Sequence, residues 1–341
     1  MSTLSSSFSP DRTEDFTALM REVRGSGLLE RRRRYYAVRI GLNLVAFAAG
    51  WVAFFLLGDS WWQLLTAAFL AVMCAQLAFI GHDAGHKQIF RTHRANDLVG
   101  NLHGGLVGIG YQWWISKHVR HHANPNHEED DPDLDIPLLA FSRSQAHTKS
   151  GFVRWTTKNQ AFLFFPLLLL EGLNLHLAGF RAAMSGELRA PRRELLLLVA
   201  HVALYVTAVV LVLSPPLAIA FIAVHQGLWG VYMGCSFAPN HKGMPTVAPG
   251  TKLDFLTKQV MTSRNVKGGR VVDFMLGGLN YQIEHHLFPN MPRPNLRHAQ
   301  VMVRAFCARN GIEYAQCGFM TSMGHVLRHL HEVGAPLRKA A

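Results

Sequence analysis

Seven histidines and one glutamine form three short clusters along the chain. The clusters comprise His82 and His86; His118, His121 and His122; and Gln282, His285 and His286. Residues three or four positions apart share one face of a helix, so each cluster presents its side chains together. Neutral imidazole suits iron, zinc, copper and nickel, whereas magnesium and calcium prefer oxygen ligands. One tetrahedral zinc ion takes four ligands, so eight side chains predict a site for two metal ions.

Polar residues close to the clusters are candidates for further ligands or supporting groups. His241 follows the last long apolar run much as His82 follows the second, which makes it a candidate ligand. Carboxylates commonly accept the second N–H of a ligating imidazole. The acids expected in that role are Asp83, Glu284, Asp131 and Asp133. For residues 128–133 a solvated acidic loop is the alternative interpretation.

The remaining histidines are expected to have other roles. His225 lies inside an apolar run and is interpreted as a hydrogen-bonded structural residue, as are His176 and His201. The C-terminal group, which includes His325, His329 and His331, is interpreted as a solvated helix face.

The composition is that of a multi-pass membrane protein. Of the 341 residues, 49% are hydrophobic and only 16% are charged, whereas soluble proteins carry about 25% charged residues. The apolar residues are also gathered into runs of nearly membrane-spanning length. The four cysteines are far apart and form no Cys-x-x-Cys pair, so neither a disulfide framework nor a zinc ribbon is expected.

Four spans are predicted, in two helical hairpins. They cover about residues 40–57, 61–81, 195–213 and 217–238. Arginines precede both hairpins, which places those ends in the cytoplasm by the positive-inside rule. Residues 161–180 are long enough for a fifth span. However, a fifth span would put His82 and His241 on opposite sides of the membrane, and polar residues in lipid are costly. We therefore expect an interfacial or re-entrant segment there.

The predicted fold is an all-α membrane bundle of four transmembrane helices with a cytosolic helical cap that holds the metal site. Residues 1–36 are expected to form a cytosolic N-terminal segment, 37–300 the main domain, and 301–341 a cytosolic C-terminal segment. The net charge of +12 is explained by cytoplasmic lysines and arginines, or by a basic face for anionic headgroups, acyl carriers or an acidic redox partner. Nucleic acid is not an expected partner, because no basic stretch accompanies a reading motif.

The three clusters resemble the histidine boxes of the membrane fatty acid desaturase family. The first two match its His-x-x-x-His and His-x-x-His-His patterns in order. Residues 280–289, Asn-Tyr-Gln-Ile-Glu-His-His-Leu-Phe-Pro, are similar to the branch with glutamine in the third box. That branch includes front-end, linoleoyl-type and related bacterial acyl desaturases. The resemblance covers about residues 35–300.

The resemblance implies a non-haem di-iron centre on the cytoplasmic side. There O2 and two iron ions would remove two hydrogens from a fatty acyl chain, carried as acyl-CoA or acyl-lipid, and leave a cis double bond and water. The implied ligands are His82, His86, His118, His121, His122, His241, His285 and His286. Gln282 replaces a family histidine, and its role as a direct, water-mediated or hydrogen-bonding group stays open.

The resemblance also bears on the partners and on the competing functions. The chain has no His-Pro-Gly-Gly haem motif, so an external donor such as a ferredoxin or flavin reductase is expected to supply electrons. Trp113 and Trp114 are candidates for the lining of an acyl tunnel, with membrane-interface anchoring as the alternative. A membrane hydroxylase or ketolase is the nearest competing function. A histidine-rich metal transporter or sensor is a more distant one.

Overall fold

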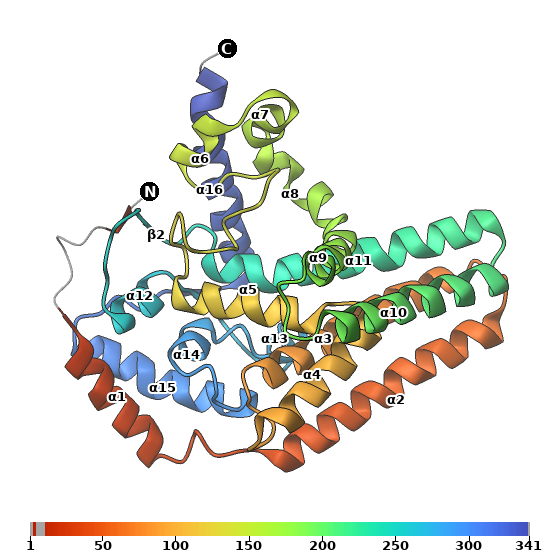
Figure 1. Cartoon of the computed structure of the whole chain (residues 1–341). Coiled ribbons are helices and arrows are strands. Elements are labelled where there is room, and N and C mark those ends of the chain that lie inside the picture. Colours follow the sequence, from red (N-terminus) through yellow and green to blue (C-terminus); the bar gives the residue numbers. More distant parts are fainter. Residues whose placement is uncertain (1–2, 5–10, 340–341) are drawn as a thin grey trace. The chain divides into compact units, whose positions relative to one another are not determined.

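The computed structural model describes residues 3–4 and 11–339, and within them nearly all regular structure is helical (Figure 1). These residues form two compact units. Unit 1 takes the described residues within 1–30, 117–164 and 236–341, and unit 2 takes residues 31–116 and 165–235. Three of the four boundaries between the units fall inside helices, which are α5 (Tyr111–Ala123), α8 (Gln160–Leu168) and α11 (Pro215–His241).

Unit 2 contains the apolar helices. Besides its part of α11, its long elements are α2 (Arg33–Leu57), α3 (Gln63–Gly85), α4 (His93–Val107), α9 (Glu171–Ser185) and α10 (Pro191–Val212). α2 and α3 lie side by side as a hairpin, and α10 turns into α11 at Leu213 and Ser214 (Figure 1). The turn between α2 and α3 contacts the turn between α10 and α11, because the backbone N–H of Ser214 donates to Asp59 Oδ1 at 2.8 Å.

Four helices are long and apolar enough to cross a membrane, as the sequence predicts. They are α2, α3, α10 and α11. Only 17% of the most apolar windows of α2 and α10 is buried within the protein, although their mean hydropathies are 2.1 and 2.7. Such large exposed apolar surfaces are not stable in water. The described part of the chain is therefore an all-α membrane bundle, with a core that joins all four helices through Phe54, Leu70, Val209 and Phe221.

The segment predicted to be interfacial or re-entrant, residues 161–180, is broken into α8 and α9. The two helices are bent by 72° between Leu168 and Glu171. This geometry belongs to a re-entrant loop or to a broken fifth span. Whether the chain crosses the membrane four or five times therefore stays a prediction, which rests on the need for His82 and His241 to lie on the same side.

Two of the membrane helices continue beyond their predicted spans and carry histidines in their last turns. α3 extends to Gly85, so that His82 lies within it and His86 is its C-cap. α11 extends to His241. α4 and α5 are separate helices, because Gly108 adopts a left-handed conformation that ends α4.

Unit 1 is built from shorter elements around a separate core. Its helices are α1 (Thr13–Gly25), α6 (Arg143–Thr148), α7 (Gly151–Lys158), α12 (Phe255–Met261), α13 (Arg270–Met275), α14 (Gln282–Leu287), α15 (Arg293–Arg309) and α16 (Phe319–Lys339). Two parallel two-residue pairings join β1 (Thr3–Leu4) to β2 (Thr246–Val247) and β3 (Asn265–Val266) to β4 (Gln316–Cys317). The core packs α1, α12 and α15 around α14.

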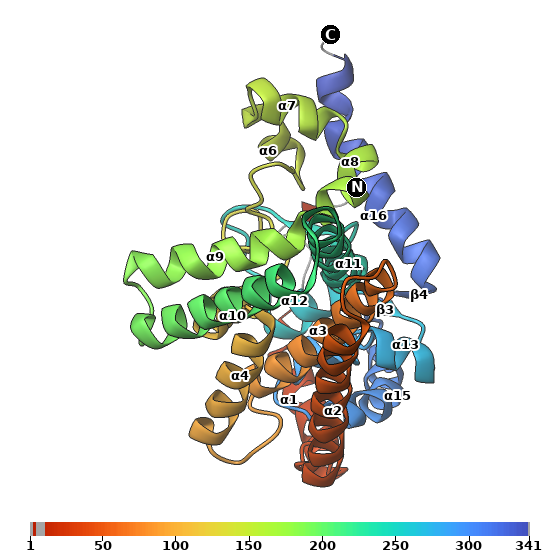
Figure 2. The same ribbon diagram turned by 90° about the vertical axis from the view of Figure 1, so that its right-hand side faces the viewer.

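The C-terminal helix corrects one sequence interpretation. α16 runs beside α6 and α7 (Figures 1 and 2). His331 is exposed, as expected of a solvated face, but His325 is half-buried and His329 is only 5% exposed. The expectation that all three histidines face solvent was wrong, because the flanking Val326, Leu330 and Val333 bury that side of the helix.

The left-handed turn at Gly108 gives a prediction about stability. Gly108 has φ 72°, its carbonyl accepts a hydrogen bond from His176 Nδ1 at 2.8 Å, and a Cβ would lie 2.5 Å from the His176 ring. We expect Gly108→Ala to cost about 2–4 kcal/mol, because backbone strain and a steric clash add. The measurement is the unfolding transition of the purified protein in detergent.

Gly186→Ala is the matched control for this prediction. Gly186 also has a positive φ, of 79°, but nothing lies within 4 Å of its added Cβ. It should lose only about 1 kcal/mol. Equal losses in the two variants would contradict the packing argument.

Candidate metal centre

Unit 1 gathers six imidazoles from three separate parts of the chain. α5 supplies three of them, the end of α11 supplies His241, and α14 supplies two; the α5 and α14 residues are His118, His121, His122, His285 and His286. The rings of His122 and His286 are stacked with centroids 4.1 Å apart. His121, His241 and His286 each offer a ring nitrogen within 4.8 Å of the others. The second and third sequence clusters and His241 are thus brought together.

The short helix α14 explains why such a cluster needs a ligand. All six of its residues are buried, although four of them are Gln, Glu, His and His. A helix this short is not stable alone. Ile283 and Leu287 hold it in the core, where each apolar side chain contributes about 1.5–3 kcal/mol. Burying the polar side chains is costly unless they are hydrogen-bonded or bind a metal.

Three of the imidazoles are oriented through Nδ1. His121 Nδ1 lies 3.0 Å from Asp131 Oδ1, and His241 Nδ1 lies 3.0 Å from the Thr262 carbonyl oxygen. His286 Nδ1 lies 2.8 Å from Gln259 Oε1. Each partner is an acceptor, so each Nδ1 carries the proton and each Nε2 keeps its lone pair. This is the arrangement of metal-binding histidines.

The Nε2 atoms of this group point at one another. His121 Nε2 lies 3.3 Å from His241 Nε2. When both rings are neutral and both Nδ1 atoms donate elsewhere, neither Nε2 has a proton to share, and the two lone pairs oppose each other. A cation bound by both would remove the repulsion. The donor set therefore fits a transition metal.

Burial and neighbouring charges act differently on His286 and His121. Burial, followed by the surrounding histidines, lowers the pKa of His286 well below its usual value and keeps the ring neutral for metal binding. Burial also acts on His121, but Asp131 and Asp133 outweigh it and raise the pKa of that ring. Asp133 also pairs with Lys117 Nζ at 2.8 Å. Two of the five acids in residues 128–133, Asp131 and Asp133, thus contact the cluster, whereas Glu129 and Asp130 are exposed to solvent.

Gln282 and Glu284, the other two polar residues of α14, contact different partners. Gln282 Nε2 lies 2.9 Å from His241 Nε2, while Gln282 Oε1 accepts from Asn240 Nδ2 at 3.2 Å. Gln282 therefore contacts a candidate ligand directly. Glu284 instead accepts hydrogen bonds from Asn265 Nδ2 and Tyr314 Oη, both at 2.7 Å. Burial raises the pKa of Glu284 to about 7.

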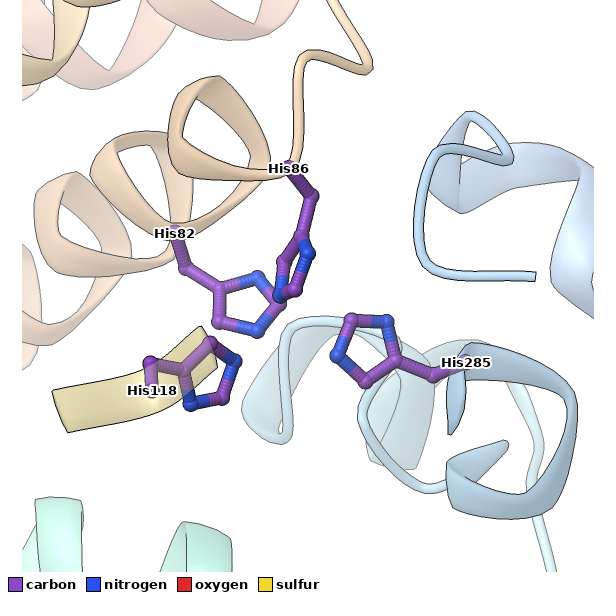
Figure 3. Close-up of side chains that lie close together, drawn as sticks. All are labelled: His82, His86, His118 and His285. Carbon is purple, nitrogen blue, oxygen red and sulfur yellow. The ribbon is translucent and has the colours of Figure 1, made fainter. Parts of the chain in front are cut away.

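Unit 2 holds the first cluster at the end of α3. The rings of His82 and His86 are 4.7 Å apart, and Figure 3 shows both projecting from the last turn of that helix. His82 Nδ1 lies 3.3 Å from Asp83 Oδ1, and the Tyr36 hydroxyl lies 3.1 Å from the other Asp83 oxygen. The Trp114 ring packs 5.3 Å from that of His82.

Figure 3 also displays two ligand candidates of unit 1, His118 on α5 and His285 on α14. Their ring centroids are 6.2 Å apart, and each offers a nitrogen within 4.8 Å of the other. Trp113, the other candidate for the tunnel lining, is half-buried, and its backbone N–H donates to Glu194 at 3.3 Å.

Sequence reasoning missed two residues that orient ligands. Gln259 is fully buried, and its amide binds both His286 Nδ1 and the carbonyl oxygen of His122, the latter at 2.9 Å. Thr262 acts through its carbonyl, which any residue type could supply. Neither residue belongs to a histidine cluster, so no spacing pattern singled them out.

Apolar spanning helices together with buried histidine groups able to bind metal define this chain as a membrane protein with candidate metal sites. A family model described as fatty acid desaturase matches residues 59–318, which contain all three clusters. The chain belongs to the fatty acid desaturase family. It is thereby an oxidoreductase that acts on fatty acyl chains, and the family expected from the histidine boxes is confirmed.

The chain is similar to curated desaturases from several kingdoms. It is 31% identical to fatty acid desaturase 3 of Bos taurus over 94% of this chain and 73% of that protein. It is 30% identical to the acyl-lipid (9-3)-desaturase of Physcomitrium patens over 95% and 63% of the two chains. It is 28% identical to the Delta(6)-fatty-acid desaturase fat-3 of Caenorhabditis elegans over 88% and 70%.

The position of Gln259 gives a prediction about metal affinity. Gln259→Leu keeps the volume but removes both hydrogen bonds, so His286 loses the acceptor that fixes its tautomer. We expect metal affinity to fall about 10–100-fold, the usual effect of losing such a partner. The measurement is metal retained during titration with a chelator.

Two further variants serve as controls for this measurement of metal affinity. Gln259→Glu keeps an acceptor for His286 Nδ1 and should restore part of the affinity. Lys258→Gln, on the same helix but partly exposed, should have no effect. Wild-type retention by Gln259→Leu would show that Gln259 does not support a ligand.

Proposed function

We propose that this chain is an O2-dependent fatty acyl desaturase that binds two iron ions and introduces a cis double bond. The observation that carries the proposal is the set of buried imidazoles with Nδ1 held by an acceptor and Nε2 turned inward. The proposed iron ligands are His82, His86, His118, His121, His122, His241, His285 and His286. Family membership supports iron as the metal.

When bound, the iron ions would supply the oxygen activation and C–H cleavage that protein side chains cannot. The chain's own residues hold the ligands. Asp131 and Gln259 keep the Nδ1 protons of His121 and His286 in place, which makes both rings better electron donors through Nε2. Asp83 is the corresponding partner for His82. Gln282 is proposed to hydrogen-bond His241 Nε2 only while that nitrogen carries no iron, because its single lone pair cannot serve both the amide and a metal ion.

The proposed reaction removes one hydrogen from each of two neighbouring acyl carbons. One O2, two electrons and two protons are consumed with these hydrogens, and two waters are formed. An external donor such as a ferredoxin or flavin reductase would supply the electrons. The acyl chain is proposed to be presented as acyl-CoA or acyl-lipid. A relative named for acyl-lipid desaturation supports the latter form.

We also propose that the metal centre faces the cytoplasm. Support comes from the arginines within residues 31–34 and 189–193, which lie just before and within the first turns of α2 and α10. By the positive-inside rule these helix starts are cytoplasmic. His82 and His241 lie at the far ends of the next helices, α3 and α11, which return to that side.

His121→Ala tests the enzyme activity. It removes a buried candidate ligand, so desaturation should fall by more than the roughly 10–100-fold that loss of a supporting partner costs. The measurement is fatty acid analysis of host lipids together with iron content, which should be about two per chain in the wild type. His331→Ala, on the exposed face of α16, is the control.

Each alternative function predicts a different product or metal. Hydroxylated lipids without new double bonds would indicate the hydroxylase or ketolase. Zinc without iron in the purified protein would indicate the transporter or sensor, and would contradict the proposed centre.

The contribution of the first cluster is tested by His86→Ala. If His82 and His86 are iron ligands, this variant should lose iron and activity although unit 1 is unchanged. His93→Ala, on an exposed histidine seven residues further on, should keep both. Full iron content in His86→Ala would exclude that residue from the centre.

A further inference from the structure

In the segment formed by α7 and the start of α8, polar side chains face the protein interior and apolar side chains face outward. Its buried face is polar, since Thr156, Thr157 and Gln160 are at most 2% exposed. Gln160 Nε2 donates to the carbonyl of Leu330 at 2.9 Å, and Thr156 Oγ1 donates to that of Leu138 at 3.1 Å. The polar side thus packs on α16 and the preceding loop, the opposite of a helix on a water-soluble surface.

The outer face of this segment is aromatic. Phe152, Trp155 and Phe162, here called the aromatic row, are 69%, 51% and 76% exposed. Phe152 and Trp155 stack with ring centroids 5.7 Å apart. Large aromatic side chains exposed together mark a surface that has a partner. Their rings are of the type enriched at the boundary between headgroups and acyl chains.

Along the chain, the charges next to the aromatic row are of one sign. Residues 136–170 contain Arg143, Lys149, Arg154 and Lys158 and no aspartate or glutamate. Such a stretch is complementary to an anionic surface and favours a bilayer with acidic lipids. A basic helix with aromatic residues on its apolar side is the pattern of helices that lie in the membrane interface.

The sequence that follows supports a bilayer over a protein partner. α8 continues into α9, and the bent pair passes the tests of length and apolarity for membrane-embedded helices. The aromatic row therefore leads directly into membrane-compatible sequence. This surface overlaps the first two residues of the predicted interfacial segment, residues 161–180, and reaches back to Lys149.

We propose that residues 149–162 of unit 1 form a membrane-interface surface that binds anionic phospholipid headgroups. The aromatic row inserts at the depth of the upper acyl chains, while Lys149, Arg154 and Lys158 bind phosphates. The surface is separate from the proposed metal ligands and would exist whether or not the chain desaturates lipids.

Spin labels test the depth of the aromatic row. Single cysteines are introduced at Phe162 or Thr148 of the full chain, in a background in which Cys74, Cys235, Cys307 and Cys317 are alanine, and the protein is placed in bilayer nanodiscs with acidic lipid. The label at 162 should collide readily with oxygen and several-fold less with a water-soluble nickel chelate. The control is Val301→Cys on α15, since Val301 is an isolated apolar residue that is 71% exposed.

Collision rates with the two reagents distinguish whether water, protein or a bilayer covers the aromatic row. Nickel collision at 162 equal to that at 301 would mean that the surface faces water, and would overturn the proposal. Low collision with both reagents would mean that protein covers it, and would also overturn it. The label at 148 leaves all three aromatic residues in place. If it gives the same collision pattern as the label at 162, loss of an anchoring ring cannot be the cause.

Lysine footprinting tests the headgroup preference on the unmodified chain. Acylation of Lys149 and Lys158 should be several-fold slower in nanodiscs with acidic lipid than in neutral ones, relative to the exposed Lys252. Equal rates in the two lipids would refute the preference for anionic headgroups. Because no activity is measured, failure of this test is distinguishable from failure of the proposed enzyme function.

Discussion

The opposed lone pairs of buried imidazoles are the interaction on which the rest of unit 1 depends. His121 and His241 meet through Nε2 atoms that both lack a proton, in surroundings that exclude water. Such an arrangement is unfavourable while both rings are neutral. A bound cation, a second proton on His121 or a change of tautomer relieves it, and Gln282 Nε2 can donate to the His241 nitrogen alone. The fold disfavours the change of tautomer, because each Nδ1 already has an acceptor, Asp131 in one case and the Thr262 carbonyl in the other. Hydrogen bonding therefore prepares the cluster for metal before any metal arrives.

This constraint also explains why the supporting elements are short but deeply packed. α14 has six residues and no capping side chain at its start, so its shape is imposed by the core formed with α1, α12 and α15. Asn265 strengthens the attachment, because its side chain binds both the Ile283 backbone N–H and the Glu284 carboxylate. Glu284 thus holds the helix to its surroundings, while the next two residues provide the imidazoles.

Hydropathy and histidine spacing predicted the broad architecture, because both are local properties of the chain. The four spanning helices and the three clusters followed from the order of residues alone. Helix ends were placed less well, since α3 and α11 continue past the lipid-length stretch to His82 and His241. Features that depend on contacts between distant segments could not be predicted from the spacing of residues. The role of Gln259 and the burial of His329 are of this kind, as is the inverted polarity of α7, because each is defined by what the opposite face contacts.

The double hydrogen bond of Gln259 has a consequence for the order in which the site is assembled. One amide joins the main chain of α5 at His122 to the ring of His286 on α14. A metal ion that orders either helix therefore also lowers the entropy cost of ordering the other. In the proposed centre of two ions, binding of the first ion would thus favour binding of the second, and little of the singly loaded form would be present.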